Sequence, residues 1–498
     1  NMVTKYVILF IFFAILFVIG ILASRRIKGS DDFFVGGKSL GYWLVAFSSR
    51  ATGESAWLLL GLTGMGAMVG VKAFWVVLGE FLGVAIAWLW MAKPFKRLTD
   101  EYDSITIPDF LESHFKPKGP LLRIIAASAL SIFVVIYVSA QIDATGQAFE
   151  SFLDWNYYTG AIVGFIIVLA YSFIGGFVAV VWSDFFQGLL MLIGLVALPI
   201  VAYINYPGEN LFQDLAAIDP VLMSWWGEGG ITGLNVASVL GLLCIGLGFL
   251  GSPQVFVRFI SVKDTKELDK GKWVAMAFTI LADAGAIFIG LFARSVFEGT
   301  SVSIGANGED SLIALVEAYM PLAIVGMYIA VVLSAIMSTI DSLLVVASSA
   351  IARDFYQKIF HPEMAQRQMT KLSRNSTLIM SLTALFIAMT VAVIVPERTV
   401  FWFVIFGWSG IAATFCPMII LALSWKQYNA SGAVASMVAG FLSIPLFKFL
   451  MPQIEHYGAY FANMEEMLPS FIMAFIAGVI ATKLTGGRNT ALPKTNAG

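Results

Sequence analysis

Apolar runs of about 20 residues recur along the whole chain, and this feature restricts its fold more than any other. A helix that crosses the hydrocarbon core of a bilayer needs about 20 mostly apolar residues. Of the 498 residues, 59% are hydrophobic and 12% are charged, and the mean hydropathy is +0.85. These values lie far from those of soluble globular proteins. The sequence therefore predicts an all-α polytopic membrane protein.

The apolar runs can be placed from end to end of the chain. Their ranges are 4–24, 39–68, 71–92, 122–148, 158–174, 178–204, 234–257, 273–297, 321–352, 373–395, 399–424, 431–451 and 467–484. The first run is too long for the core of a signal peptide and is followed by the basic segment "SRRIKG". We therefore predict a retained first helix and about thirteen transmembrane helices in total.

The distribution of Lys and Arg predicts the orientation, because basic residues resist translocation. With the N-terminus outside, most of the 30 Lys and Arg fall in cytoplasmic segments. Few fall outside, among them Lys5, Arg294, Arg398 and Lys448. We predict a multi-pass protein of the inner (plasma) membrane with its N-terminus outside and its C-terminus in the cytoplasm. The apolar runs make a lipid bilayer the expected partner. Nucleic acid is not expected, because the net charge is −2 and the Lys and Arg residues form no basic face.

Two of the apolar runs contain residues that interrupt a helix. Residues 51–55 read "ATGES", and residues 246–253 read "GLGFLGSP". Unwound backbone at membrane depth is tolerated only where it is buried in protein or lines a cavity. Paired interruptions at corresponding places of two halves are typical of inverted-repeat transporters, in which solute and ions bind at the breaks. The alternative for either segment alone is that its glycines allow close helix packing.

A later run presents small and hydroxyl side chains on one helical face. In "LSAIMSTIDSLL" (333–344), Ala335, Ser338, Thr339 and Ser342 are spaced i, i+3, i+4 and i+7. A hard cation such as Na⁺ takes oxygen ligands from hydroxyls, carbonyls and carboxylates. An unwound "ATGE" segment would release carbonyls to complete such a shell. The alternative is that these hydroxyls bond back to their own helix.

Several segments together resemble the sodium/solute symporter family, which includes the sodium/proline and sodium/glucose transporters. The resemblance covers nearly the whole chain, and within the family it is closest to the sodium/proline branch, through "WLLLGLTG" (57–64) and Tyr137. The segments that carry it are "DDFFVGGKSLG" (31–41), "SSRATGESAWLLLGLTG" (48–64), "TIPDFLESHF" (106–115), "YSFIGGFVAVVWSDFFQG" (171–188), "GSPQVFVRF" (251–259) and "LSAIMSTIDSLL" (333–344).

The resemblance implies a LeuT-type five-plus-five inverted repeat preceded by one extra helix. The expected divisions are 1–38 for the extra helix and a cytoplasmic loop, 39–204 for the first repeat, 205–424 for the second repeat with its outer loop, and 425–498 for the last helices and a short tail. The resemblance also implies a principal sodium site. Its ligands would be the carbonyls of Ala51, Glu54 and Ala335 and the hydroxyls of Ser338 and Thr339.

A second sodium site is predicted around Asp184, Asp341 and Ser342, whose positions match a further sodium site of some family members. Asp184 is an intramembrane carboxylate with no basic residue within several turns of the sequence. Two carboxylates that share a small site repel each other unless a cation or a proton lies between them. The alternative is that Asp184 caps a helix end and that Asp341 is protonated or faces water.

The solute pocket is predicted from family position to contain Trp57, Tyr137, Gln141 and Phe249. Aromatic walls, together with the free N–H groups of a half-helix, suit a small zwitterion such as proline. Most aromatic residues of such a chain pack against lipid or other helices, so residue type alone does not select these four.

The chain departs from the proline branch at several of these positions. Gly53 stands where that branch has an aspartate, and Glu54 stands where it has an apolar residue. Ile245 and Phe249 stand at two positions that are aromatic in that branch. Arg50 is spaced i,i+4 from Glu54 and could pair with it. Asp143 is a further intramembrane carboxylate outside the proline pattern.

These features together predict a sodium-coupled secondary active symporter, with Na⁺ as the coupling ion, that imports proline or a related small zwitterion by alternating access and works as a monomer. A sodium symporter for a sugar, sialic acid or a monocarboxylate is the alternative. A membrane-embedded enzyme is disfavoured, because the histidines fall in predicted loops (His114, His361 and His456) and no H-E-x-x-H or G-x-S-x-G motif occurs. A transporter-like sensor is also disfavoured, since the segment after residue 485 is shorter than a signalling domain.

Overall fold

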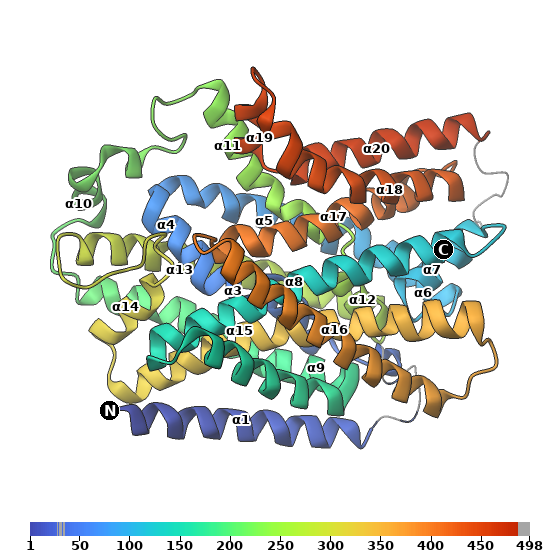
Figure 1. Ribbon diagram of the computed structural model, residues 1–498, viewed down its shortest axis with the longest axis horizontal. Coiled ribbons are helices and arrows are strands. Elements are labelled where there is room, and N and C mark those ends of the chain that lie inside the picture. Colours follow the sequence, from blue (N-terminus) through green and yellow to red (C-terminus); the bar gives the residue numbers. More distant parts are fainter. Residues whose placement is uncertain (27, 29–31, 33–34, 487–498) are drawn as a thin grey trace.

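The chain folds into a bundle of helices that run mostly along one long axis (Figure 1). The computed structural model describes residues 1–26, 28, 32 and 35–486. Within these residues there are helices and one isolated bridge, between Leu40 and Val262, but no strand. The all-α prediction is confirmed. The end of the predicted C-terminal tail lies outside the described residues.

Eleven helices in the described part of the chain are long and apolar enough to cross a membrane. The predicted number was thirteen. One of the eleven, Tyr42–Glu101, is 60 residues long and covers two predicted runs, and Tyr157–Tyr171 is apolar but shorter than the 18 residues required. The chain turns inside the first of these at Gly70, whose φ is +69°. The polytopic character is therefore confirmed, and the number thirteen stays a prediction.

The first half of the chain contains long helices and several shorter helical segments. Their bounds are α1 Met2–Ser24, α3 Tyr42–Ala56, η2 Trp57–Leu62, α4 Thr63–Val69, α5 Phe74–Ile86, η4 Ala87–Met91, α6 Ala92–Glu101, α7 Ile107–Phe115, α8 Leu121–Leu153, α9 Tyr157–Ile204 and α10 Leu211–Ile218. Short 3₁₀ turns, η1 Gly36–Lys38 and η3 Gly70–Ala73, complete this half.

The second half begins with an interrupted helix. Its bounds are α11 Gly233–Leu243, η6 Cys244–Phe249, α12 Pro253–Ser261, α13 Thr265–Phe297, α14 Ser311–Tyr319, α15 Leu322–Ser349, η7 Ala350–Phe360, α16 Gln366–Ile394, α17 Val400–Ser424, α18 Ala430–Pro445, α19 Gly458–Met464 and α20 Met467–Leu484. The short helical segment η5 Pro220–Met223 lies between α10 and α11, and the segments η8 Leu446–Leu450 and η9 Met451–Gln453 lie between α18 and α19.

Helix α9 makes two passes along α1. Its 48 residues would extend over about 72 Å if straight, more than twice the roughly 30 Å of a hydrocarbon core. Residues in and next to α9 contact residues in and next to α1. The pairs are Tyr6 with Trp155, Gly20 with Tyr171, Arg26 with Trp182 and Phe12 with Phe186. From the first pair to the second, the residue numbers of both partners increase, so the two segments run in the same direction. From the third pair to the fourth, the residue number increases in α9 and decreases in α1, so the direction is reversed. The second half of α9 therefore runs back along α1, as the predicted runs 158–174 and 178–204 require.

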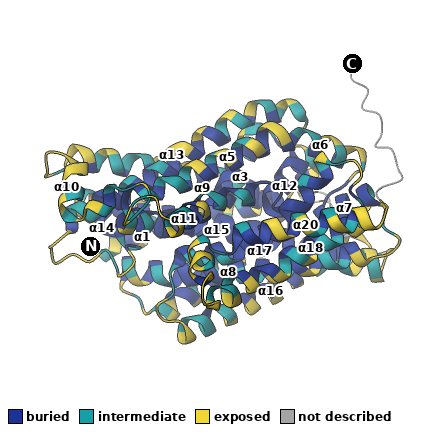
Figure 2. Cartoon of the chain, turned by 90° about the horizontal axis from the view of Figure 1, so that it is seen from above, coloured by how far each residue is buried: buried dark blue, intermediate teal, exposed yellow. Residues whose placement is uncertain are grey.

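Burial separates central helices from helices at the periphery. In the most apolar 18-residue window of the segment Leu322–Phe360, which contains α15, every residue is buried, whereas only 28% are buried in the corresponding windows of α1 and α16. Figure 2 shows the same division, with buried residues concentrated on α3, α15 and α17. Apolar side chains exposed on outer helices are expected where a protein faces lipid. The core therefore lies around α15, which packs against α3.

Both predicted helix breaks are present. Ser55 has φ 53° and ψ −168°, which interrupts α3 inside the predicted "ATGES" segment. The other break lies between α11 and α12, where Leu250 is non-helical and Gly251 has φ +144°. Close packing requires glycine beside this second break, because a Cβ on Gly83 of α5 would lie 2.1 Å from the carbonyl oxygen of Gly246.

Candidate functional site

The break at Ser55 changes the hydrogen bonding of the carbonyls before it. In an uninterrupted helix, the N–H groups of Ser55 and Ala56 would donate to the carbonyls of Ala51 and Thr52. The Ala56 N–H donates instead to Oε1 of Gln141 at 3.3 Å. The same interruption lets the Ser55 hydroxyl accept the N–H of Trp57 at 3.2 Å. The carbonyl of Thr52, at the end of the first half-helix, thus becomes available to another partner.

The hydroxyl face predicted on α15 meets these carbonyls. Oγ of Ser338 lies 3.2 Å from the carbonyl oxygen of Ala51 and 3.0 Å from that of Ala335. Oγ1 of Thr339 lies 3.4 Å from the carbonyl oxygen of Thr52 and 3.1 Å from that of Ala335. All five residues are buried. The structure therefore brings together Ala51, Ala335, Ser338 and Thr339 from the predicted principal site.

The separations between these oxygens range from those of long hydrogen bonds to those of oxygens that share a cation. Hydroxyl donors in proteins usually lie about 2.7–2.8 Å from their oxygen acceptors, and all four distances here are longer. Oxygens that bind one cation at about 2.3–2.6 Å and at right angles lie roughly 3.3–3.7 Å apart. Only the separation between Thr339 and Thr52 lies in this range. Both hydroxyls also bond back to Ala335 of their own helix, so the set would have to open slightly to admit a sodium ion.

One predicted ligand is placed differently from its neighbours. The carbonyl of Glu54 accepts the N–H of Trp57, and the carbonyl nearest to Thr339 on α3 is that of Thr52. The Glu54 side chain pairs with Arg50 in the same helix, as the i,i+4 spacing suggested. Thr52 was missed because the sequence locates the break only to a segment, whereas the released carbonyls depend on which residue leaves the helix.

Asp184, predicted in a second sodium site, has an arginine partner from a distant segment. Arg258 on α12 approaches Asp184 at 3.2 Å, and both side chains are fully buried. The Ser48 hydroxyl donates to the same carboxylate at 2.6 Å. The absence of a nearby base in the sequence was therefore misleading, because Arg258 lies 74 residues away and reaches Asp184 only through the fold.

Ser342 links the two predicted ion sites. Its hydroxyl lies 2.8 Å from that of Thr52 and receives a hydrogen bond from Arg258 at 2.5 Å. Asp341 is also buried on the same helix. A continuous polar network thus runs from the oxygens at Ser338 and Thr339 to Asp184. The second sodium site stays a prediction, and Arg258 lies where it supplies positive charge to that region.

A small closed cavity lies beside the first break. It is lined by Gly53, Trp57, Glu80, Tyr137, Ile245, Val404, Ile405 and Trp408, and its volume is about 10 Å³. This is near the minimum that holds one water molecule. Phe401 of α17 packs on Trp57 with ring centroids 5.6 Å apart. The cavity therefore lies between the two breaks, and the aromatic side chains of Trp57, Tyr137 and Trp408 form part of its wall.

The four predicted solute residues are close to this cavity but not equivalent. Trp57 and Tyr137 line it. Phe249 packs against Trp408, with ring centroids 4.9 Å apart, and the side-chain oxygen of Gln141 accepts a hydrogen bond from the Ala56 N–H. The resemblance predicted all four in one solute pocket, and the structure separates the two that line the cavity from the two that lie near it.

Several residues of this region were missed. Glu80 lines the cavity, Asp283 lies beside it, and the indole N–H of Trp408 donates to the carbonyl of Ile245 at 2.9 Å. A signal for the first two was present, because a carboxylate inside an apolar run is a functional candidate by its position alone. Trp408 gave no such signal among the many aromatic residues of the chain.

Asp143 has a structural role outside this cavity. Nε of Arg398 lies 3.0 Å from its carboxylate, and Gln147 donates to it at 3.1 Å. Tyr157 donates to the same carboxylate. These contacts join the end of α8 to the start of α9 and the loop before α17, so the intramembrane carboxylate is accounted for by an ion pair.

Gly53, which departs from the proline branch, packs directly against Phe249. A Cβ on Gly53 would lie 2.5 Å from Cε1 of Phe249, whose ring also receives the Arg50 guanidinium at 4.7 Å from its centroid. A side chain at position 53 would therefore require the Phe249 ring to move.

Gly53→Ala is expected to lower the free energy of unfolding by about 1–3 kcal/mol, because overpacking forces Phe249 from its place. The same substitution should cost less in a Phe249→Leu background, and thermal unfolding of purified protein measures both. Gly119→Ala is the matched control, since a Cβ there meets nothing within 4 Å. Equal costs with and without Phe249 would show that the contact does not limit position 53.

Comparison with known proteins agrees with this architecture. The model of the sodium:solute symporter family matches residues 33–440. Sodium/proline symporters of Staphylococcus aureus strains JH9 and JH1 are each 32% identical over 485 residues, which is 96% of this chain and 92% of theirs. These relatives match the chain almost from end to end.

Two solved structures share the fold. One is the substrate-bound outward-open state of a Na⁺-coupled sialic acid symporter, with a TM-score of 0.81 at 20% identity, covering 98% of this chain and 99% of that one. The other is Mhp1, a nucleobase-cation-symport-1 family transporter, with a TM-score of 0.54 at 11% identity, covering 91% and 94%. The fold is that of LeuT-type symporters, as the resemblance implied. The family model matches most of the chain, and relatives that are 32% identical cover nearly its whole length. This protein therefore belongs to the sodium:solute symporter family.

Proposed function

We propose that this protein imports a small organic solute, proline or a related zwitterion, by sodium-coupled symport. The observation that carries the proposal is the contact between the carbonyls of Ala51 and Thr52 and the hydroxyls of Ser338 and Thr339. This oxygen set lies at the break that also forms a wall of the central cavity. Family membership supports sodium as the coupling ion, and the relatives named sodium/proline symporter support the solute.

The proposed mechanism couples the two sites through α3. A sodium ion that enters from outside binds the oxygens of α3 and α15 and holds the broken helix against α15. Because Trp57 directly follows the break, the same event positions a wall of the solute cavity. Sodium then leaves toward the cytoplasm, driven by its gradient and by a membrane potential worth about 2.3 kcal/mol per charge per 100 mV.

The proposed orientation has the N-terminus outside. The basic segment after α1, the segment Ala92–Glu101 and the loop before α13 would then face the cytoplasm, in agreement with the bias of Lys and Arg. The proposed functional unit is the monomer in the plasma membrane, because the breaks and the cavity lie within one chain.

Uptake into sealed proteoliposomes tests the function. With an inward sodium gradient and a negative interior, labelled L-proline should accumulate, and replacing sodium by choline should abolish accumulation. Sialic acid, a sugar and a monocarboxylate are added as competitors, since the sialic acid symporter of the same fold shows that solutes vary. An enzyme or a sensor need not accumulate solute. Sodium-independent accumulation, or none with any solute, would overturn the proposal.

A further inference from the structure

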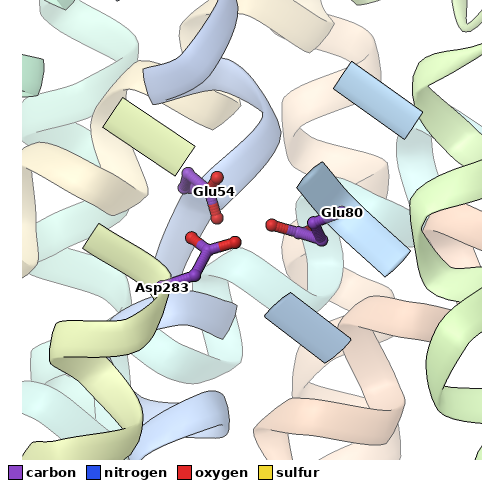
Figure 3. A group of neighbouring side chains, drawn as sticks. All are labelled: Glu54, Glu80 and Asp283. Atoms are coloured by element: carbon purple, nitrogen blue, oxygen red, sulfur yellow. The ribbon is translucent and has the colours of Figure 1, made fainter. Parts of the chain in front are cut away.

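Three carboxylates from different helices meet beside the central cavity. Glu54 of α3, Glu80 of α5 and Asp283 of α13 each offer an oxygen, and these oxygens lie within 4.8 Å of one another (Figure 3). All three side chains point toward one another, and all three residues are fully or almost fully buried. Glu80 also lines the cavity, so the cluster reaches the space where a solute would lie.

Positive charge is scarce at this cluster. Among the described residues, Arg50 is the one base in ion-pair contact with it, through Glu54 and, at 3.6 Å, through Glu80. Three acidic groups therefore face one guanidinium. Buried charges without a partner are costly, and more so at membrane depth. This imbalance favours a ligand that brings positive charge to Glu80 and Asp283.

Two unpaired donors belong to the same region. Within the described residues, Nε1 of Trp57 and Nε2 of Gln141 have no hydrogen-bond partner, and both side chains are buried. Trp57 lines the same cavity as Glu80, and Gln141 lies one helical turn after the cavity residue Tyr137. A buried donor without an acceptor costs free energy. These two donors are therefore available to an anionic or carbonyl group of a ligand.

We propose that the cavity, once it widens beyond the space for one water molecule that it has in this structure, recognises a solute with an ammonium group and a carboxylate. The ammonium group binds Glu80 with Asp283 behind it, and the carboxylate binds the N–H groups of Trp57 and Gln141. The acceptors of Glu80 and the donors of Trp57 and Gln141 complement the two ends of an amino acid. This inference rests on the proposed symport. It selects zwitterions over sialic acid, sugars and monocarboxylates, which lack an ammonium group.

A ligand panel on the purified full-length protein tests the selectivity. In saturating sodium, L-proline and prolinamide keep the ammonium group, whereas cyclopentanecarboxylate, sialic acid and galactose lack it. A rise in the unfolding temperature is expected only with ligands that carry the positive charge. A rise with cyclopentanecarboxylate, sialic acid or galactose would overturn the inference and leave sodium symport intact. No sodium-dependent response to any ligand would count against the proposed function itself.

Substitution of Glu80 separates the solute from sodium. Glu80→Gln should weaken the apparent affinity for the responding ligand at least about tenfold, as expected for loss of a charged hydrogen bond. The sodium concentration for half-maximal response, measured at saturating ligand, should change less than about twofold. A shift in sodium dependence with unchanged ligand affinity would identify the cluster as a sodium site and overturn the inference.

The control and the second variants guard against misfolding. Glu466→Gln changes another buried carboxylate, which pairs with Lys448. Lys448 still pairs with Glu465 at 2.8 Å in this variant, so ligand affinity should stay unchanged. If Glu80→Gln does not fold, Glu80→Asp and Asp283→Asn replace it. Glu80→Asp retains the charge and should retain ligand response, whereas Asp283→Asn should weaken it. The reverse order would contradict the assignment.

Discussion

Ser338→Ala and Thr339→Ala are each expected to raise the sodium concentration for half-maximal uptake at least about tenfold. Each change removes a hydroxyl oxygen that contacts carbonyls on both α3 and α15. Loss of a hydrogen-bonding group from a charged partner costs about 1.5–3 kcal/mol, which corresponds to about 10–150-fold in affinity. Initial rates of solute uptake against external sodium measure the change.

Two variants on the same helix serve as controls. Ser334→Ala removes a hydroxyl one turn away that donates to the carbonyl of Ala330 at 2.7 Å, and it should leave sodium dependence unchanged. Thr339→Ser keeps the oxygen and should retain most of the affinity. Unaltered sodium dependence in both Ser338→Ala and Thr339→Ala would remove these hydroxyls from the ion site.

The local features of this site were predictable because they depend on short spacings. The i, i+3, i+4 and i+7 pattern places Ser338, Thr339 and Ser342 on one face of any α-helix. Gly53 and the polar residues around it mark a break inside an apolar run, and Ser55 lies within that segment. In both cases the relevant physics extends over one or two helical turns. The same spacing rule predicted the pair between Arg50 and Glu54.

The partners across the bundle were not predictable, because they depend on how distant helices pack. Asp184 and Arg258 meet only when α9 and α12 lie side by side. Glu80 and Asp283 lie 203 residues apart in the chain, so their approach to Glu54 is visible only in the fold. A carboxylate in an apolar run signals that a partner exists. It does not say whether that partner is a base, another acid or a ligand.

Arg258→Gln is expected to destabilise the protein by about 3–5 kcal/mol, because it leaves the buried carboxylate of Asp184 without its guanidinium. Arg258 also donates to Ser48 at 3.0 Å, to Ser342 and to the carbonyl of Gln254, so several elements lose a common partner. Thermal unfolding in detergent and the yield of folded protein both report this loss.

A second substitution shows whether the charge is the cause. Asp184→Asn together with Arg258→Gln removes both charges, and the double variant should be more stable than Arg258→Gln alone. Lys93→Gln is the control, because its pair with Asp269 is partly exposed and such pairs are worth about 0–1 kcal/mol. A double variant that is no more stable than Arg258→Gln would show that the guanidinium acts through packing.

The same variants test the predicted second sodium ion at Asp184, Asp341 and Ser342. If a sodium ion shares this region with Arg258, Asp184→Asn or Asp341→Asn should each weaken the binding of that ion. The sodium activation curve should then become less steep while uptake stays measurable. In Arg258→Gln, sodium is the cation that remains to neutralise the buried acids, so the unfolding temperature should depend on sodium more strongly than in the unmodified protein. Asp341→Asn in that background should weaken this dependence. Retained steepness in both aspartate variants would leave one coupled ion and would assign Asp184 to Arg258 alone.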